Sequence, residues 1–468
     1  MLHPIPPPPV KKKISKSLGN LQPRFIMLGG FLGAGKTTTL LRLALSLQRK
    51  GLRVGLITND QAAGLVDSAL AEELDLPVRE IAGGCFCCRS ESLVEALDRL
   101  EAHSQPQVFL AEPVGSCTDL VATVSLPLER IYKKGFVMAP YAVVVDPYRA
   151  MQSLGVEGEM LFSADVNYIY RKQLEEAEVI AINKVDVISP ERLAGLRAAL
   201  EREYPQARIL EIASRDGLGV EALFDILSTE AGLTRQVMEM DYERYAVGEA
   251  LLGWVNIQGM LGAGVREDKH GAGQQRKAAK KERGLAVRPG ALATEAAGNS
   301  AGASSTPVSI DGNRWLMDLA VGIADKLTKR EIEVAHLKLS LTGSAGVVDG
   351  SPGNEGGDDR SGKGKGAGSL ETGVQGRITS PRSGGMAAVQ WVRSGSVPEL
   401  TWRMDGPLTG GRLLINLRAE ADPDVLAAET LAVLARQLEV LPGLVLSAMT
   451  TEHFRPGKPV PVHRVAVA

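Results

Sequence analysis

The fold of this chain is decided by GGFLGAGKTTT at residues 29–39, which follows the apolar run RFIML and precedes a helical pattern that starts near Lys36. Glycines at positions 30, 33 and 35 let successive backbone N–H groups turn toward phosphate oxygens, and the N-terminus of the following helix adds positive potential. A simple turn between a strand and a helix, which is the alternative, needs neither a lysine nor a threonine here. The stretch therefore predicts a P-loop that binds a nucleotide.

Individual residues of the P-loop have distinct expected roles. The Lys36 ammonium should reach the β- and γ-phosphates, and the Thr37 hydroxyl should ligate magnesium. Hydrolysis would be in-line attack of water on the γ-phosphate, with Lys36, the P-loop amides and magnesium stabilising the developing charge. The expected nucleotide contacts in this stretch are Gly30, Gly33, Ala34, Gly35, Lys36, Thr37 and Thr38.

Short apolar runs alternate with helical patterns from residue 24 to about residue 233. Such alternation is typical of a parallel sheet wrapped by helices, and near-continuous apolar strands fit a sheet that is covered on both faces. The predicted strands are RFIMLGG, RVGLIT, QVFLAE, YAVVVD, EVIAINK and RILEIA. We predict an α/β fold of the P-loop NTPase class, with a mostly parallel sheet covered by helices.

The 468 residues divide into three predicted parts. Residues 1–23 are a flexible tail rich in proline and lysine, residues 24–235 form the P-loop domain, and residues 236–468 form a smaller α+β domain. Two stretches of the last part, at about 259–311 and 343–387, lack the apolar surface needed to order and are predicted insertions. The other predicted elements of this part are helices at 313–328 and 423–438 and strands at 332–342, 388–394, 399–404 and 412–418.

The choice of base rests on Asn183-Lys184-Val185-Asp186, which directly follows the apolar strand EVIAI. P-loop GTPases carry Asn-Lys-x-Asp at this position, where a buried Asp carboxylate accepts from both guanine N1–H and N2–H₂. Adenine cannot supply that pair of donors, and the carboxylate would be left unpaired. Ser214 lies where these enzymes place a loop that covers guanine, although a plain turn also fits its surroundings. The motif predicts GTP as the nucleotide.

Two acids at predicted strand ends are candidates for the magnesium site. Asp60 ends LITND, and Glu112 begins Glu112-Pro113-Val114-Gly115, in which the Gly115 N–H can reach the γ-phosphate. The structural alternatives are an ordinary Asn-Asp turn for Asp60 and a helix cap for Glu112. We expect Lys36, Thr37, Glu112 and Gly115 to act in catalysis. Gln61 and Asp67 are candidates for positioning the attacking water, and the sequence does not choose between them.

Three of the four cysteines are crowded into Cys85-Phe86-Cys87-Cys88, and Cys117 stands apart in the sequence. Such a cluster in a reducing compartment indicates metal binding or redox activity rather than disulfides. Its predicted place before an amphipathic helix lowers thiolate pKa and favours soft metals. Three sulfurs are one short of a closed zinc site, so we expect an open or shared site for zinc, with cobalt, nickel or copper(I) as alternatives. Small buried thiols beside a Gly-Gly turn are the structural alternative.

The overall composition limits the partners. A formal net charge of -2 argues against nucleic acid and anionic membranes as partners, and the basic run at 276–283 is most simply a solvated charge run. No apolar stretch approaches the roughly 20 residues that span a bilayer, and the first residues lack an apolar signal core. We therefore expect a cytoplasmic location, with neither nucleic acid nor membrane as a partner.

Taken together, GGFLGAGKTTT, GGCFCC, EPVG and NKVD, in this order and spacing, resemble the CobW-type metallochaperone GTPases, relatives of urease and hydrogenase accessory proteins. The resemblance covers roughly residues 24–235. It implies a cytosolic GTPase that binds a transition metal at Cys85, Cys87 and Cys88 and couples GTP binding or hydrolysis to metal delivery into a client. It also implies that Glu112 stands where most GTPases have an aspartate.

This chain departs from the family pattern in two places. Many members carry Asn-Glu-Phe-Gly after the second strand, whereas this chain has Asn59-Asp60-Gln61-Ala62, closer to the urease-type accessory proteins. A histidine-rich metal store is also missing, and we expect His453 and His463 to pack on the surface or in the core. YERYAVGEALLGWVN and GRLLINLRAEADPDVL resemble more a subgroup associated with corrinoid proteins and methyltransferases, which brings in cobalt or corrinoid chemistry.

The leading hypothesis is a GTP-hydrolysing chaperone that uses GTP and magnesium and moves zinc or cobalt, bound at the cysteine cluster, to a client metalloprotein. A GTP-dependent maturation or reactivation factor for a corrinoid (cobalamin) protein is an alternative. A second class is a non-catalytic metal sensor or scaffold, and a third is a small-molecule kinase, which NKVD disfavours. A homodimer is left open.

Overall fold

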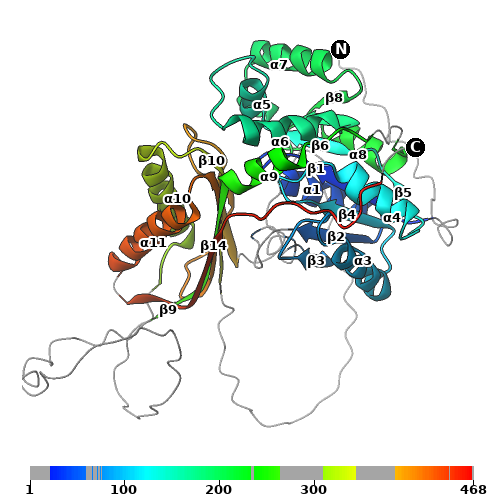
Figure 1. Cartoon of the computed structure of the whole chain (residues 1–468). Coiled ribbons are helices and arrows are strands. Elements are labelled where there is room, and N and C mark those ends of the chain that lie inside the picture. The colour runs from blue at the N-terminus through cyan, green and yellow to red at the C-terminus, as the bar shows by residue number, and fades with distance from the viewer. Residues whose placement is uncertain are drawn as a thin grey trace, which may run out of the picture.

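The structure is a computed structural model of the chain, and it describes residues 22–59, 66, 71, 74, 76–232, 237–263, 309–343, 385–441 and 443–465. Nearly all of the predicted tail, most of both predicted insertions and the basic run lie outside the described residues. Figure 1 shows two units side by side, one built on a parallel sheet and the other on an antiparallel sheet.

The first unit contains an eight-stranded sheet in the order β3-β2-β4-β1-β6-β7-β8, with β5 paired to β1. Every pairing in it is parallel. Its strands are β1 (Arg24–Gly29), β2 (Val54–Asn59), β3 (Val78–Ile81), β4 (Val108–Glu112), β5 (Val137–Met138), β6 (Ala142–Val145), β7 (Val179–Ile182) and β8 (Arg208–Glu211). The six strands predicted from apolar runs are all present, which confirms the α/β P-loop fold.

Helices cover both faces of this sheet. The side chains of Phe25 and Met27 in β1 point into one core, and those of Ile26 and Leu28 point into the other, as strand periodicity requires. Core residues of α1 (Lys36–Arg49) and α8 (Val220–Thr229) belong to the second core. The first core takes in α3 (Ser90–Ser104), η1 (Val121–Ser125), α4 (Leu126–Arg130), α5 (Pro147–Ser153), α6 (Ala164–Glu175) and α7 (Pro190–Glu203).

The second unit is a six-stranded antiparallel sheet in the order β12-β11-β10-β13-β9-β14. Its strands are β9 (Leu252–Ala263), β10 (Val334–Gly343), β11 (Met386–Trp391), β12 (Glu399–Trp402), β13 (Gly411–Glu420) and β14 (Leu444–Phe454). Two helices, α10 (Gly312–Lys329) and α11 (Pro423–Glu439), pack on one face and bury a third core. They lie on the side away from the parallel sheet (Figure 1), so the other face of the antiparallel sheet is turned toward the first unit.

The structure corrects the predicted start of the first insertion. Residues 259–263 belong to β9, which pairs with both β13 and β14, and Ile310 bridges to Leu408. Glycine-rich sequence has low strand propensity, but pairing on both sides outweighs it. At Gly259 the missing side chain is useful, because a Cβ there would lie 2.8 Å from the Leu446 side chain. The edge strand β14 was not predicted.

One buried arginine joins the two units. Arg149, in α5, donates to the carbonyl oxygens of Leu32 at 2.7 Å, Ala335 at 3.2 Å and Val392 at 2.6 Å. It also lies over the Phe31 ring at 5.4 Å from the centroid. The guanidinium therefore ties the P-loop directly to β10 and to the chain that follows β11, and burial lowers its pKa.

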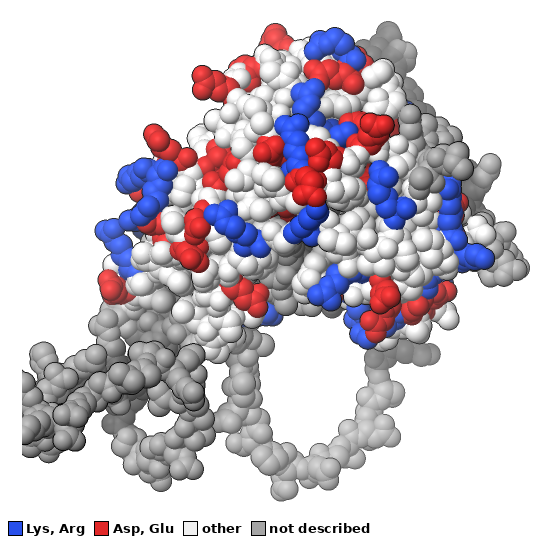
Figure 2. Space-filling model, in the orientation of Figure 1, with Lys and Arg blue, Asp and Glu red and all other residues white. Residues whose placement is uncertain are grey.

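A short helix, α9 (Tyr242–Leu251), leads from the first unit into β9. Although it lies beyond the predicted boundary at residue 235, α9 packs against α6, and a Cβ at Gly248 would lie 2.5 Å from the Asp165 carbonyl oxygen. Figure 2 shows lysines and arginines interspersed with acids on the visible face, in agreement with the small net charge. Within the described residues, no helix has the length and apolar character needed to cross a membrane.

Candidate nucleotide and metal sites

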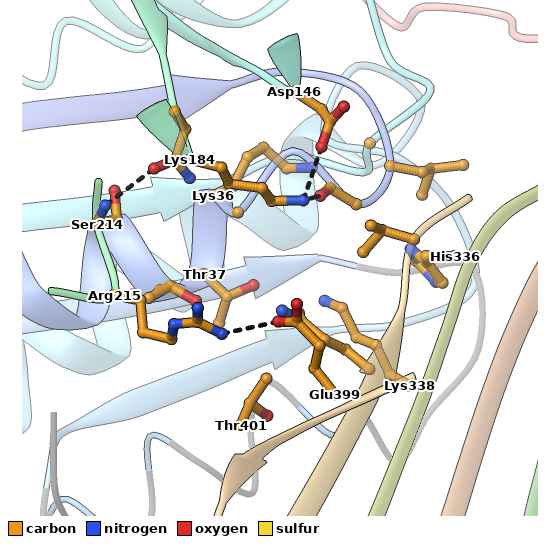
Figure 3. A pocket seen from close by; sticks show the side chains of 18 of the residues that line it. Lys36, Thr37, Asp146, Lys184, Ser214, Arg215, His336, Lys338, Glu399 and Thr401 are labelled. Carbon is orange, nitrogen blue, oxygen red and sulfur yellow. Dashed lines mark hydrogen bonds and ion pairs between the residues drawn. The ribbon is translucent and has the colours of Figure 1, made fainter. Parts of the chain in front are cut away.

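A cavity of about 440 Å³ lies between the two units. It is lined by the P-loop and by residues that follow β4, β6, β7 and β8, and its opposite wall comes from β10, β11 and β12. Figure 3 shows Lys36, Thr37 and Lys184 of the first unit and His336 and Lys338 of the second around the same space. The cavity therefore lies at the carboxyl ends of parallel strands, where ligands of open α/β sheets bind.

The P-loop has the backbone conformation that its glycines predict. Gly30 has φ of 130°, and a Cβ there would lie 2.2 Å from the Val144 carbonyl oxygen. Gly35 has φ of 99° and immediately precedes α1, so the helix begins at Lys36 as expected. Lys36 Nζ lies 3.4 Å from the Phe31 carbonyl oxygen. Any other residue at either glycine would strain the turn.

Not every predicted P-loop contact lines the cavity. Gly33, Gly35, Lys36, Thr37 and Thr38 do, whereas Gly30 and Ala34 are not among the lining residues. Gly30 instead packs against β6, and the Ala34 carbonyl oxygen accepts a hydrogen bond from Asn183. These two residues therefore support the P-loop turn through their contacts with β6 and Asn183 and do not line the cavity.

The two described candidates for the magnesium site meet at the cavity. The Thr37 hydroxyl donates to Glu112 Oε1 at 2.9 Å, and both side chains are buried. The next helical element after Glu112 begins only at Val121, so Glu112 contacts the P-loop threonine rather than capping a helix directly. Gly115 also approaches the P-loop, because a Cβ there would lie 2.9 Å from the Leu32 backbone nitrogen. Hydroxyl and carboxylate oxygens are the ligands that suit Mg²⁺.

Residues that are predicted to contact the base also form hydrogen bonds with the P-loop. Asn183 Nδ2 donates to the Ala34 carbonyl at 2.9 Å, while its Oδ1 accepts from the Ser214 N–H at 2.9 Å. Lys184 Nζ donates to the Gly33 carbonyl at 2.9 Å. Ser214 Oγ lies 2.7 Å from Thr39 Oγ1, so this residue is part of a buried polar network rather than a plain turn.

Asp186 lies at the surface. Its carboxylate, which is expected to be buried where it contacts guanine, lies 3.7 Å from an Arg215 guanidinium nitrogen. Arg215 in turn pairs with Glu399 of β12 at 2.7 Å. The physical reason is that Asp186 stands on the short η2 helix (Val185–Val187) at the open rim of the cavity, where none of its residues is buried.

Sequence reasoning missed Asp146, which ends the predicted strand YAVVVD. Its carboxylate caps α5 by accepting from the Arg149 N–H at 3.1 Å and pairs with Lys184 Nζ at 2.9 Å. Burial alone would raise the Asp146 pKa, but the charges of Lys184 and Arg149 outweigh it and hold the pKa below its usual value. Its signal was available, because it is an acid at the end of a buried strand.

Sequence reasoning also missed the wall contributed by the second unit. His336 and Lys338 lie on the face of β10 that is turned toward the cavity, while Leu337 and Leu339 face the helices. His336 is buried, and neither ring nitrogen has a hydrogen-bond partner among the described residues. Burial, followed by the charge of Lys338, holds its pKa well below the usual value, so the ring is neutral. The alternation in HLKLSL is a strand signal, but it does not reveal what the polar face covers.

The loop after β2 lies largely outside the described residues. This applies to Asp60, Gln61, Ala62 and Asp67, so their roles stay predictions. Asn59, which ends β2, is described and lines the cavity. Its Nδ2 donates to the Gly84 carbonyl at 2.7 Å, and its Oδ1 accepts from the Phe86 N–H at 2.9 Å.

The three clustered cysteines are brought together after β3. The Sγ atoms of Cys85 and Cys87 are 2.7 Å apart, and those of Cys85 and Cys88 are 3.2 Å apart. All three sulfurs lie within 4.8 Å of one another, a spacing that one metal ion could bridge. Cys85 and Cys87 are buried, and Cys88 is partly exposed.

Cys117, which stands apart in the sequence, affects the ionisation of the cluster. It is buried, and hydrogen bonds from the thiols of Cys117, Cys87 and Cys88 hold the pKa of Cys85 well below its ordinary value. Hydrogen bonds with Cys117 and Cys85 raise the pKa of Cys87 well above its ordinary value, and the hydrogen bond with Cys85, together with burial, does the same for Cys117. Cys85 is therefore the thiol of the cluster that loses its proton most readily.

The C-terminal segment crosses the first unit after β14 (Figure 1) and reaches the cysteine cluster. The Val462 N–H donates to the Cys87 carbonyl at 3.0 Å, and Arg464 Nε pairs with Asp119 at 2.7 Å. His463 contacts the Tyr132 hydroxyl at 3.2 Å, and His453 pairs with an exposed acid of α11. Each histidine therefore has a polar partner within the protein, which is Tyr132 for His463 and Asp424 for His453.

Fold and sites together define a P-loop protein of the α/β class with a thiol cluster near its nucleotide cavity. Residues 24–211 match the family model for the "CobW/HypB/UreG, nucleotide-binding domain". This part of the chain is thus similar to that nucleotide-binding domain, in agreement with the resemblance seen in the sequence.

Three curated relatives illustrate the similarity. The zinc chaperone YeiR of Escherichia coli is 26% identical over 183 residues, covering 38% of this chain and 51% of that protein. Zinc-regulated GTPase metalloprotein activator 1 of Dictyostelium discoideum is 26% identical over 232 residues, covering 43% and 47%. The zinc chaperone CobW of Pseudomonas aeruginosa is 28% identical over 226 residues, covering 44% and 60%. The chain thus spans about half the length of the curated relatives it matches.

Proposed function

We propose that this protein is a GTP-hydrolysing metal chaperone, in which the nucleotide state controls a transition metal held by Cys85, Cys87 and Cys88. The observation that carries the proposal is the position of Asn59. Its side chain lines the nucleotide cavity and at the same time holds the backbone of the cysteine loop at Gly84 and Phe86. A movement of Asn59 at the end of β2 would therefore act directly on the backbone of the cysteine loop, through its hydrogen bonds to Gly84 and Phe86.

The nucleotide is proposed to lie with its phosphates at the P-loop. Lys36 and the P-loop N–H groups would stabilise the charge that develops on the γ-phosphate as water attacks in line. Thr37 and Glu112, with Asp60 as a further candidate, would hold magnesium, which supplies charge neutralisation when bound. Gly115 would offer its N–H to the γ-phosphate, which its close approach to the P-loop supports.

Guanine is proposed as the base because Asn183 and Lys184 hold the P-loop, while Asp186 lies at the rim of the cavity, where its carboxylate can receive the base edge in place of Arg215. Covering by guanine would remove Asp186 from water and replace its pairing with Arg215. The cavity wall from β10 supports a second point. We assign His336 and Lys338 to the phosphate side of the nucleotide, since the His336 ring is buried beside the positive charge of Lys36.

Zinc is the proposed metal, because three thiols within bridging distance suit a soft, tetrahedral ion, and cobalt is the alternative. The relatives named above as zinc chaperones support the same choice. Free thiols in a cluster suit a reducing compartment such as the cytoplasm. The recipient would be a client metalloprotein, with a corrinoid protein as the alternative, and a homodimer remains compatible with this scheme.

Phosphate release measures the proposed activity directly. Purified full-length protein is assayed with GTP and magnesium, with and without zinc or cobalt, and compared with the variant in which Cys85, Cys87 and Cys88 are all serine. We expect GTP turnover that responds to metal in the wild type and not in the variant, which should still bind GTP. Tight GTP binding without turnover under any metal would support a non-catalytic sensor or scaffold instead.

A further inference from the structure

We propose that Glu399, in the second unit, is a positioning residue for guanine: it holds the Arg215 side chain away from Asp186 and so leaves the Asp186 carboxylate able to receive the base. The inference rests on the proposed function, because it takes Asp186 to be the group that contacts guanine. It adds that base recognition is shared between the two units. The residue that reads the base belongs to the parallel-sheet unit, and the residue that keeps it available belongs to the antiparallel sheet.

Arg215 lies between two carboxylates at the rim of the cavity. Its Nη1 atom is 2.7 Å from Glu399 Oε2, and its Nη2 atom is 3.7 Å from Asp186 Oδ2. Figure 3 shows the Arg215 guanidinium pointing toward Glu399. The attraction within an ion pair falls with distance, so the shorter contact is the stronger one. Glu399 therefore competes with Asp186 for the same guanidinium and holds it more closely.

The backbone is held on both sides of the pair between Arg215 and Glu399. The Arg215 carbonyl oxygen accepts a hydrogen bond from the Arg42 guanidinium at 2.5 Å, and Ser214, which precedes it, is bonded through its N–H to Asn183. Glu399 begins β12 and is paired in register with Gln390 of β11, which also lines the cavity. An exchange of partners at Arg215 would therefore be made by its side chain.

The second unit reaches the rim near Asp186 at another point as well. The Arg393 guanidinium, in the chain between β11 and β12, lies over the Tyr148 ring at 4.0 Å from the centroid. The Tyr148 hydroxyl donates to the Val187 carbonyl oxygen at 2.6 Å, and Val187 follows Asp186 in η2. Arg393, Tyr148 and Val187 all line the cavity. The antiparallel unit is thus placed to influence the rim where the base is expected to bind.

Binding of guanine would exchange the partners of Asp186. The base N1–H and N2–H₂ donate to the carboxylate, the 3.7 Å contact with Arg215 is given up, and the guanidinium keeps its pair with Glu399. These two acids are the ones that pair with Arg215 in the described part of the chain. Without Glu399, the guanidinium would therefore be left with Asp186. Guanine would then have to displace an ion pair before it could bind.

Competition by GTP and by ATP against a fluorescent guanine nucleotide tests the inference on the full-length protein. Glu399→Gln keeps the size of the side chain and removes its charge. The affinity for GTP relative to ATP should then fall by about three- to fivefold, the range of one exposed ion pair. Because both nucleotides carry the same phosphates, this ratio cancels any general effect of charge on binding. The loss should shrink in about 1 M salt, which screens exposed ion pairs.

Removal of Arg215 separates a positioning role of Glu399 from a structural one. Arg215→Ala leaves Asp186 without a competitor, so the double variant Arg215→Ala/Glu399→Gln should recover the wild-type ratio of GTP to ATP affinity or exceed it. The matched control is Glu201→Gln. It removes the charge from a similarly exposed pair with Arg197, at 2.9 Å and away from the cavity, and should leave the ratio unchanged.

Two results would overturn the inference. One is an unchanged ratio in Glu399→Gln, and the other is a loss that persists in the double variant, because Glu399 would then act on the nucleotide or on the fold without Arg215. A wild-type protein that binds GTP and ATP equally well would instead overturn the guanine assignment on which the inference rests. The failure of the inference and the failure of the proposed function are therefore distinguishable.

Discussion

Replacing His336 with leucine should stabilise the nucleotide-free protein and weaken nucleotide binding, two effects of opposite sign. A neutral imidazole offers one donor and one acceptor, and both ring nitrogens are buried without a partner among the described residues. Each unsatisfied polar atom costs about 1–3 kcal/mol, so removing both should raise the free energy of unfolding by about 2 kcal/mol or more. For a chain of 468 residues that corresponds to a rise of about 2 °C in Tm.

The loss on the binding side follows from the same ring. If His336 hydrogen-bonds to a charged phosphate, removing it costs about 1.5–3 kcal/mol, or roughly 10- to 150-fold in nucleotide affinity. Calorimetric unfolding and a fluorescent guanine-nucleotide titration measure the two effects on the same preparations. The matched control is Ser340→Ala, because Ser340 lies on the same face of β10, is fully buried and has no partner in the described chain, yet does not line the cavity.

The control should gain stability and keep nucleotide affinity. A His336→Leu protein that loses stability would mean that the ring nitrogens are satisfied in the free protein. Unchanged affinity would remove His336 from the phosphate site. The pH dependence of the free energy of unfolding provides a further check on the wild-type protein. The folded pKa of His336 is depressed, so the unfolded chain takes up the proton first, and stability should fall as the pH drops below about 6.5. The His336→Leu variant should not show this part of the loss of stability at low pH.

Three other changes have defined outcomes. Asp186→Asn should reduce the preference for GTP over ATP by about 100-fold in competitive binding, and an unchanged preference would remove Asp186 from base reading. Asn183→Ala leaves the Ala34 carbonyl and Ser214 N–H unpaired and should cost about 2–4 kcal/mol in urea unfolding. Burial raises the Glu176 pKa to about 8. The contribution of Glu176 to the free energy of unfolding is therefore fully present below about pH 4.5 and is lost as the pH rises through about 8. Glu176→Gln should flatten the decline in stability over this range, and equal slopes would contradict the shift.

The parallel-sheet unit could be predicted well because its signals are local. An apolar run, a glycine turn and a helical pattern follow one another within the P-loop, and each step constrains the next. The same reasoning located Glu112 and Asn183 at strand ends, since the carboxyl ends of parallel strands share one edge of the sheet. The exposure of Asp186 could not be predicted in the same way, because it depends on how far the η2 helix projects beyond that edge.

The contacts that depend on tertiary packing could not be predicted. Cys117 is distant in sequence from Cys85, and its effect on the Cys85 pKa depends on the path of β4 and of the turn after it. His336 and Lys338 face the nucleotide cavity because the antiparallel sheet packs over the P-loop through Arg149, an arrangement that no local pattern encodes. Strand β9 shows the same limit, since pairing on both sides overrides its glycine-rich sequence.

The central claim is that the nucleotide state sets the affinity for the metal. Zinc affinity measured by chelator competition, with the protein saturated first with a non-hydrolysable GTP analogue and then with GDP, tests it most directly. Coupling through Asn59 predicts zinc affinities that differ by about tenfold or more, with the reciprocal change in nucleotide affinity when zinc is bound. Equal zinc affinity in the two nucleotide states would contradict the account.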